Sequence, residues 1–157
     1  MIGEIVTSQQ EWDARFYGMA KFVEAHFSKD PHRKVGAILV SADRRSISLG
    51  YNGFPRGTPD VKAHLLDEEV RQARMVHGEL NAILQADFDR LGSTLYATKF
   101  PCNVCAGVIA NSRVARLVAP RPNYDSQTWG KAYRAAWQIV QAAEVEYVEM
   151  REPTSSE

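Results

Sequence analysis

The sequence lacks the features that mark several large classes of protein. Lysine plus arginine and aspartate plus glutamate are each 19 among 157 residues, so the formal net charge is zero. Proteins that coat nucleic acid or bind anionic membranes carry a basic excess, so we expect neither partner. No run approaches the roughly 20 apolar residues of a membrane span. Residues 1–6 lack the basic start and long apolar core of a signal peptide, so we expect a cytoplasmic protein.

Cysteine is scarce as well: the chain has only Cys102 and Cys105. Two cysteines are too few for a disulfide scaffold. Their C-x-x-C spacing leaves a metal site, a redox pair or coincidence. A chain of this length can bury roughly 70% of its unfolded surface, so it needs no metal merely to hold a core.

No stretch rich in proline, glycine or serine divides the chain, so we expect a single domain over residues 1–150 and a polar tail over 151–157. Apolar residues at steps of three and four predict a first helix over residues 8–27, with Ser8 as its N-cap. Asp30-Pro31 ends this helix. The residues expected on its buried face are Trp12, Phe16, Met19, Ala20, Val23 and Phe27.

The rest of the chain alternates between short apolar runs and amphipathic segments. Strands are predicted over residues 35–40, 46–51, 94–98, 115–119 and 145–149. Helices are predicted over residues 79–88, 102–111 and 129–142, and residues 61–76 are mixed and at best helical. Residues 50–57 are dense in turn formers and predict a loop. This alternation indicates a layered α/β fold.

Two short segments carry the candidate metal-ligating and catalytic residues. His77-Gly78-Glu79 opens one predicted helix, and Pro101-Cys102-Asn103-Val104-Cys105 opens the next. Helices that flank a parallel strand lie side by side with their N-termini at the same sheet edge, so the imidazole and the two thiols can meet. One imidazole and two thiolates are three ligands, which leaves the fourth position of a zinc ion to water. Helix N-termini also stabilise thiolates.

Glu79 lies two residues after His77, at the same helix end but on another face. Zinc lowers the pKa of a bound water to about 7. A carboxylate beside that water can take its proton and later give it to a leaving amine. The arrangement H-x-E…P-C-x-x-C is the pattern of zinc-dependent nucleobase deaminases.

Two other interpretations of the cysteine pair remain open. A thioredoxin-like redox pair follows the first strand of a different pattern, and here a proline precedes the first cysteine. A structural zinc site would need a fourth ligand. His26, His32 and His64 do not stand at ligand spacing from one another, and we expect them at the surface or in the core.

Four segments together resemble the deoxycytidylate (dCMP) deaminase family: DPHRKVGA (30–37), GYNGFPRG (50–57), HGELNAI (77–83) and PCNVCA (101–106). The resemblance covers about residues 12–148, and the GYNGFPRG loop separates the chain from cytidine and tRNA adenosine deaminases. It implies a cytidine deaminase-like three-layer α/β/α sandwich with a five-stranded mixed sheet. It also implies zinc-dependent hydrolysis of dCMP to dUMP and ammonia, with one Zn²⁺ per chain.

The resemblance implies substrate contacts as well. The sugar would meet Asn52, the backbone N–H of Gly78 would meet the pyrimidine O2, and Tyr124 would border the nucleotide. The base pocket would be lined by Val35, Gly36 and Ala37. A monophosphate needs cations, which Arg33, Lys34 and Arg56 could supply. The alternatives are a solvated cluster of charges, a plain turn role for Asn52 and a core position for Tyr124.

The chain departs from the family at Gly78, where alanine is usual. The missing methyl would make room near the base, so we expect tolerance of 5-substituted cytosines such as 5-methyl-dCMP; neutral replacement is the alternative. Many relatives are hexamers, activated by dCTP and inhibited by dTTP, and the loop over residues 50–57 takes part in that effector site. The resemblance therefore implies a homo-oligomer and an effector dNTP with Mg²⁺, which Arg56 could bind instead of substrate.

Two rival functions remain. One is a deaminase of the same fold that acts on cytidine, guanine or a tRNA adenosine. The other is an inactive nucleotide-sensing zinc protein, which the presence of Glu79 argues against.

Overall fold

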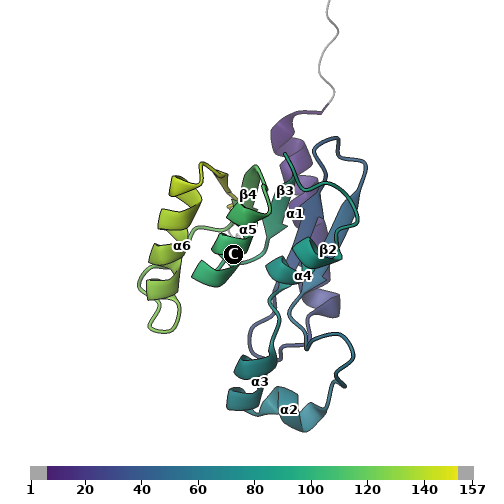
Figure 1. The fold of residues 1–157 in the computed structure, drawn as a ribbon, viewed down its shortest axis with the longest axis vertical. Helices are drawn as coiled ribbons and strands as arrows, with labels where there is room; N and C mark the ends of the chain where they lie inside the picture. The colour runs from purple at the N-terminus through teal and green to yellow at the C-terminus, as the bar shows by residue number, and fades with distance from the viewer. Residues whose placement is uncertain (1–6, 152–157) are drawn as a thin grey trace, which may run out of the picture.

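The computed structural model describes residues 7–151; residues 1–6 and all but the first residue of the predicted tail at 151–157 lie outside them. Its centre is a five-stranded sheet in the order β2-β1-β3-β4-β5. Figure 1 labels three of these strands, β2, β3 and β4. Strand β1 runs antiparallel to β2 and β3, whereas β3, β4 and β5 are parallel. The strands are β1 (Gly36–Val40), β2 (Ile47–Tyr51), β3 (Thr94–Ala97), β4 (Arg116–Ala119) and β5 (Glu146–Glu149). The five-stranded mixed sheet is confirmed, and every predicted strand boundary lies within one residue of the observed one.

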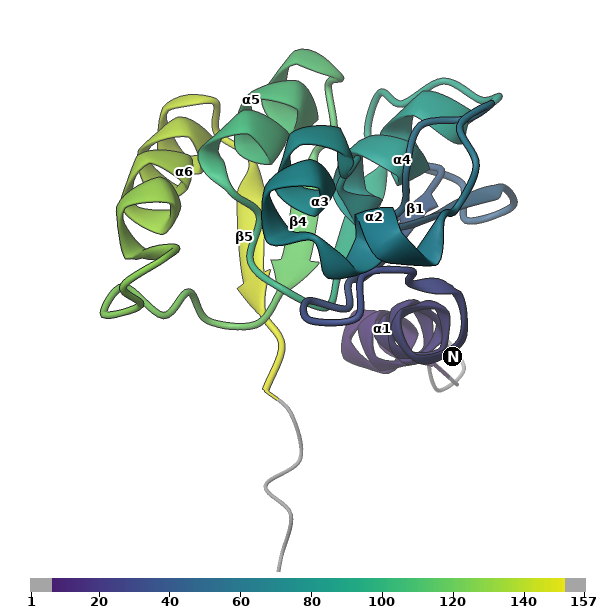
Figure 2. The same cartoon turned by 90° about the horizontal axis from the view of Figure 1, so that it is seen from below.

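Helices cover both faces of this sheet, which confirms the expected three-layer α/β/α sandwich (Figure 2). One face is covered by α1 (Gln9–Phe27), and the other by α4 (Gly78–Gln85), α5 (Asn103–Asn111) and α6 (Gly130–Ala142). Alternate residues of β1 enter the two cores: Ala37 and Leu39 one, Ile38 and Val40 the other. The short helices α2 (Lys62–Leu66) and α3 (Glu68–Arg74) lie beyond one end of the sheet. Within residues 7–151, no helix has the length and apolar character needed to cross a membrane.

Helix α1 begins as predicted and buries Phe16, Ala20 and Val23 as expected, but its buried face is only partly the predicted one. Ser8 and Glu11 form a reciprocal capping box at its N-terminus. The expected core residues Met19 and Phe27 are 39% and 43% exposed, so this part of the prediction was wrong. The buried residues are Asp13, Phe16, Tyr17, Ala20, Val23 and Glu24. Hydrophobic periodicity missed the polar members because burial of a carboxylate depends on partners elsewhere in the chain.

Helix α4 packs very closely on β2. A Cβ atom at Gly50 would overlap the carbonyl oxygen of Gly78 and the backbone nitrogen of Ala82, so only glycine allows this approach. The helix ends at Gln85, three residues earlier than predicted. Arg90 satisfies its C-terminal carbonyls by donating to the carbonyl oxygens of Ile83 (3.0 Å) and Ala86 (3.3 Å). The close packing of Gly50 against Gly78 sets the position of the α4 N-terminus relative to β2.

Candidate active site

Two helix N-termini bring three metal-ligand side chains together. His77 is the N-cap of α4, Cys102 is the N-cap of α5, and Cys105 lies in the first turn of α5. The Nδ1 atom of His77 is 3.6 Å from Sγ of Cys102 and 3.4 Å from Sγ of Cys105. The ligand atoms all lie within 4.8 Å of one another. The predicted convergence of these residues is confirmed.

The geometry of this cluster fits zinc. A nitrogen at about 2.05 Å and a sulfur at about 2.3 Å from one tetrahedral zinc lie about 3.6 Å apart, which matches the separations between the His77 nitrogen and the two sulfurs. Among residues 7–151, no fourth His, Cys, Asp or Glu ligand joins the cluster. Three protein ligands and an open fourth position are typical of a catalytic rather than a structural site.

The thiols are electrostatically prepared to bind a cation. A hydrogen bond from the Cys105 thiol, aided by one from His77, lowers the pKa of Cys102 to about 4. That hydrogen bond and burial raise the pKa of Cys105, whose proton is shared with its neighbour. The hydrogen bond to Cys102 raises the pKa of His77. The lowered pKa of Cys102 favours its thiolate, and thiolates are the form that binds metal.

Glu79 faces the same cavity as His77 and Cys102. Its side chain is buried, and among the described residues Oε2 has no hydrogen-bond partner. Burial raises the pKa of Glu79. A buried carboxylate oxygen without a partner is costly unless a polar group in the cavity satisfies it. A water held by a metal at the three ligand atoms would be such a group. The unpaired Oε2 of Glu79 is therefore a second observation that fits a metal at this site.

The cavity at Glu79 is small, at about 10 Å³, which is room for about one water. A second cavity of about 210 Å³ adjoins it, and Arg33, Asn52, His77 and Trp129 line both. Between them, the guanidinium of Arg33 lies 4.2 Å from the centre of the Trp129 ring and donates to the Tyr133 hydroxyl (2.5 Å). A pyrimidine ring can enter only if this wall shifts.

Asn52 is buried where the two cavities meet. Its Nδ2 donates to the carbonyl oxygen of Arg33 (3.0 Å), and its Oδ1 accepts from the backbone N–H of Gly78 (2.9 Å). Asn52 therefore ties the segment before β1 to the start of α4. The Gly78 N–H, which we expected to face the pyrimidine O2, is already used in this bond.

The three residues expected to line the base pocket lie in different places. Val35 lines the small cavity. Gly36 faces α1, where a Cβ atom would overlap the backbone of Ala20 and Glu24. Ala37 is fully buried in the core beneath α4. Successive strand residues point to opposite faces, so a contiguous run such as residues 35–37 cannot line one cavity throughout.

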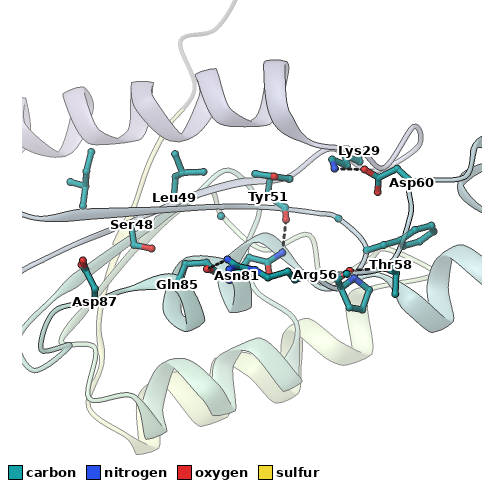
Figure 3. A pocket seen from close by; sticks show the side chains of 16 residues that line it. Lys29, Ser48, Leu49, Tyr51, Arg56, Thr58, Asp60, Asn81, Gln85 and Asp87 are labelled. Atoms are coloured by element: carbon teal, nitrogen blue, oxygen red, sulfur yellow. Dashed lines mark hydrogen bonds and ion pairs between the residues drawn. The ribbon is translucent and has the colours of Figure 1, made fainter.

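The three cationic residues expected to bind the phosphate also lie in different places. Arg33 lines both cavities, whereas Lys34 is exposed and lines neither. Arg56 belongs to a third cavity of about 620 Å³ over β2 and the loop after it, where its guanidinium donates to Gln85 (2.5 Å; Figure 3). Tyr124 lines neither of the first two cavities; it packs half-buried against the core.

Several lining residues were not predicted from the sequence: Lys99, Phe100 and Trp129 at the small cavity, and Arg71 at its neighbour. Lys99 and Phe100 directly precede the Pro-Cys motif, a signal that could have found them. Trp129 lies five residues after Tyr124, in the loop after the fourth strand where we looked for an aromatic residue. No local signal marks Arg71.

Gly78 does not open space as expected. A Cβ atom there would lie 3.2 Å from Cγ1 of Val35, 3.3 Å from Cα of Tyr51 and 3.4 Å from the carbonyl oxygen of Gly50. The missing methyl therefore corresponds to a close approach of α4 to β2 and Val35. A methyl at this position would press on Val35, which lines the small cavity.

Comparisons with known proteins agree with this geometry. Residues 10–120 match the family model described as the cytidine and deoxycytidylate deaminase zinc-binding region. An uncharacterised deaminase of Aliivibrio fischeri is 34% identical over 137 residues, 87% of this chain and 91% of that protein. The deoxycytidylate deaminase of Mycobacterium phage D29 is 36% identical over 129 residues, 73% of this chain and 98% of that protein.

A solved structure has the same fold. It is the dCMP deaminase of cyanophage S-TIM5 in complex with dCMP and dUMP, with a TM-score of 0.70 and 22% identity. The match covers 92% of this chain and 100% of that one. Sequence and fold lead to one conclusion: the chain belongs to the cytidine and deoxycytidylate deaminase family of zinc-binding proteins.

Proposed function

We propose that this protein is a zinc-dependent deoxycytidylate deaminase, which hydrolyses dCMP to dUMP and ammonia. The observation that carries the proposal is Glu79, a buried carboxylate whose Oε2 lacks a partner and which faces the cavity of three zinc-type ligands. Two further points support it: the relatives that bear the name deoxycytidylate deaminase in human and phage D29 are 32% and 36% identical to this chain, and GYNGFPRG is present.

In this mechanism His77, Cys102 and Cys105 hold the zinc ion. The ion, when bound, activates a water molecule at neutral pH. Glu79 accepts a proton on its free carboxylate oxygen and delivers it to the departing amino group. Burial, which raises the pKa of Glu79, favours the protonated carboxyl between these two transfers.

The walls suggest how the nucleotide lies. Val35, Phe100 and Trp129 present apolar surface at the small cavity, which suits a pyrimidine ring. Asn52 lines both cavities and therefore suits the sugar between base and phosphate. Lys34, Gly36, Ala37 and Tyr124 stand outside these walls, so any contact they make with dCMP requires movement on binding. A 5-substituted dCMP remains an alternative substrate.

A panel of substrates tests the proposal. Purified zinc-loaded protein is incubated with dCMP, 5-methyl-dCMP, deoxycytidine, CMP, cytidine, guanine and a tRNA adenosine substrate, and released ammonia is measured. The proposal predicts that dCMP or its 5-methyl form gives the highest kcat/KM. Preference for another base or for a free nucleoside would contradict it, and zinc binding without turnover would favour a nucleotide sensor.

We also propose that the chain forms a homo-oligomer, a hexamer by analogy with the family. Support comes from β2, an edge strand of the sheet on which Ile47 and Leu49 are 47% and 43% exposed, and from Leu84 on the adjacent α4, 66% exposed. An apolar sheet edge of this kind favours association. Sedimentation of Leu49→Glu and Leu84→Glu against wild type would reveal dissociation, and a monomeric wild type would refute the proposal.

A dNTP effector, dCTP or dTTP with Mg²⁺, fits the third cavity better than the catalytic one. That cavity holds Arg56, the GYNGFPRG loop and Lys29, which is paired with Asp60 (Figure 3). Effector response would then depend on Arg56 but not on the exposed Arg45 of the β1–β2 turn. Rates with and without dCTP or dTTP in Arg56→Gln and Arg45→Gln test this, and an equal response in both variants would contradict it.

The two free thiols suit a reducing compartment such as the cytoplasm, which is where we propose that the protein works.

A further inference from the structure

The cavity next to the catalytic one is the space into which a group attached to the base would extend. It has a volume of about 210 Å³ and shares Arg33, Asn52, His77 and Trp129 with the catalytic cavity. Its far wall comes from α3, through Arg71, Gln72 and the following Met75. A nucleotide with its base at Glu79 and its sugar at Asn52 would direct its remaining part toward α3.

Arg71 is the unusual residue of that wall, because its guanidinium is buried with only 7% of the residue exposed. Its Nη1 donates to the carbonyl oxygen of Leu65 (2.9 Å), and its Nε lies 3.5 Å from Oδ1 of Asp30. A guanidinium has five N–H donors. Among the described residues, Nη2 of Arg71 has no hydrogen-bond partner in the protein, and the side chain lines the cavity.

The charges around the cavity do not cancel. One carboxylate, that of Asp30, lines it together with two guanidinium groups, those of Arg33 and Arg71. The Oδ1 atom of Asp30 is already engaged, since it accepts from the backbone N–H groups of His32 (2.8 Å) and Arg33 (3.0 Å). One positive charge is therefore in excess on the cavity wall, and the half-buried Arg33 and the buried Arg71 together favour an anion there.

We infer that Arg71 binds the 5′-phosphate of the substrate, together with Arg33, and thereby makes the enzyme select a nucleotide over a nucleoside. This inference rests on the proposed deaminase function. The planar fork of donors on an arginine matches the oxygens of a phosphate. Asp30 and Leu65 hold one side of the Arg71 guanidinium, which leaves the other side for the phosphate.

A purely structural role for Arg71 would make a different prediction. The ion pair with Asp30 also joins α3 to the segment before β1. If Arg71 only held these segments together, its loss would impair deoxycytidine and dCMP alike. A phosphate ligand instead affects only the substrate that carries the phosphate, so the ratio between the two substrates separates the roles.

The test measures kcat/KM for dCMP and for deoxycytidine in wild type, Arg71→Gln, Arg71→Lys and Arg74→Gln. Loss of a charge-assisted hydrogen bond predicts that Arg71→Gln lowers the preference for dCMP by about 10–100-fold. Arg71→Lys keeps the charge and should retain part of that preference. Arg74, three residues on and exposed, is the matched control and should leave the preference at the wild-type value.

Other outcomes are equally decisive. An equal loss on both substrates in Arg71→Gln overturns the inference and leaves the deaminase proposal standing, whereas a wild type inactive on both overturns the two together. If Arg71→Gln does not fold, Arg71→Lys decides: an unchanged preference overturns the inference, since a lysine lacks the fork. Inorganic phosphate should compete with dCMP in wild type and do so less in Arg71→Lys; equal competition would count against the role.

Discussion

Asp13 and Glu79 are both buried carboxylates, 4% and 3% exposed, but they lie on opposite faces of the sheet and in opposite surroundings. Asp13 accepts hydrogen bonds from Arg116 (3.1 and 3.0 Å), Tyr96 (2.8 Å) and Gln9 (2.8 Å). Among residues 7–151, the Oε2 atom of Glu79 has no partner at all. The fold thus satisfies one buried acid completely and leaves the other incomplete.

The two carboxyl groups respond in opposite directions. Burial raises the pKa of Asp13, but the hydrogen bonds from Arg116, Tyr96 and Gln9 outweigh it and hold that pKa below its usual value. For Glu79, burial dominates and the pKa is raised. A paired acid stabilises the fold, whereas an unpaired acid costs stability and is retained where chemistry needs it. The contrast is the one expected between a structural carboxylate and the carboxylate that we propose as catalytic.

The largest expected effect comes from removing a metal ligand beside Glu79, which tests the Glu79 half of the comparison with Asp13. Cys105→Ser should reduce bound zinc from one ion per chain to traces and abolish deamination, because two strong ligands rarely retain zinc. Zinc content by mass spectrometry and ammonia release check this. Val104→Ser, at the exposed residue between the cysteines, is the matched control. Full activity in a zinc-free Cys105→Ser protein would show that Glu79 needs no metal.

The next largest effect is the loss of stability expected when Asp13 is replaced. Asp13→Asn should lower the free energy of unfolding by about 2–3 kcal/mol, because Arg116 loses a buried partner and keeps only Glu146. Denaturant unfolding measures the loss, and Asp125→Asn, at an exposed aspartate, is the control. The kcat/KM for dCMP should remain at the wild-type value. A stable Asp13→Asn protein with impaired catalysis would reverse the two assignments.

The stability of the protein at acid pH should depend on Asp13. Since the pKa of Asp13 is lower in the folded protein, its contribution to stability is complete above its ordinary value of about 4 and is lost as the pH falls below it. Wild type should therefore lose stability more steeply than Asp13→Asn as the pH falls below about 4. Unfolding measured across this range tests the point; parallel curves would mean that Asp13 has an ordinary pKa.

The smallest effect concerns the wall near Glu79. Gly78→Ala places a methyl 3.2 Å from Val35, which must shift by a few tenths of an ångström and so reshapes the cavity. We expect the ratio of kcat/KM between dCMP and 5-methyl-dCMP to change by about 2–10-fold, the scale of a small packing change. An unchanged ratio would mean that glycine at this position is a neutral replacement.

The position of Glu79 beside the metal-ligand cluster was predictable from the sequence, and the burial of Asp13 was not. His77, Glu79, Cys102 and Cys105 are fixed by short spacings and by their positions at two helix starts, so local rules place them. Asp13 owes its burial to Arg116, a partner 103 residues away. Hydrophobic periodicity carries no information about such a partner, and it assigned Met19 and Phe27 to the core instead.

The residues that line the cavities were predicted less well than the metal-ligand cluster, for a related reason. Arg56 lies only four residues after Asn52, yet it lines the third cavity while Asn52 is buried between the other two. The course of the loop decides this, and turn residues predict a loop without its direction. Arg71 reaches the site from a short helix whose position depends on contacts with Asp30 and Leu65. Residues contributed by tertiary packing leave no pattern in the local sequence.

The most direct test of the account is the turnover of dCMP by zinc-loaded Glu79→Gln, with zinc content and unfolding temperature measured on the same samples. Glutamine keeps the shape of the side chain but cannot carry the proton. We predict full zinc content, an unfolding temperature no lower than that of wild type, and a kcat reduced by about 10²–10⁴-fold. Near-wild-type turnover with full zinc content would contradict the assignment of Glu79 as the proton carrier.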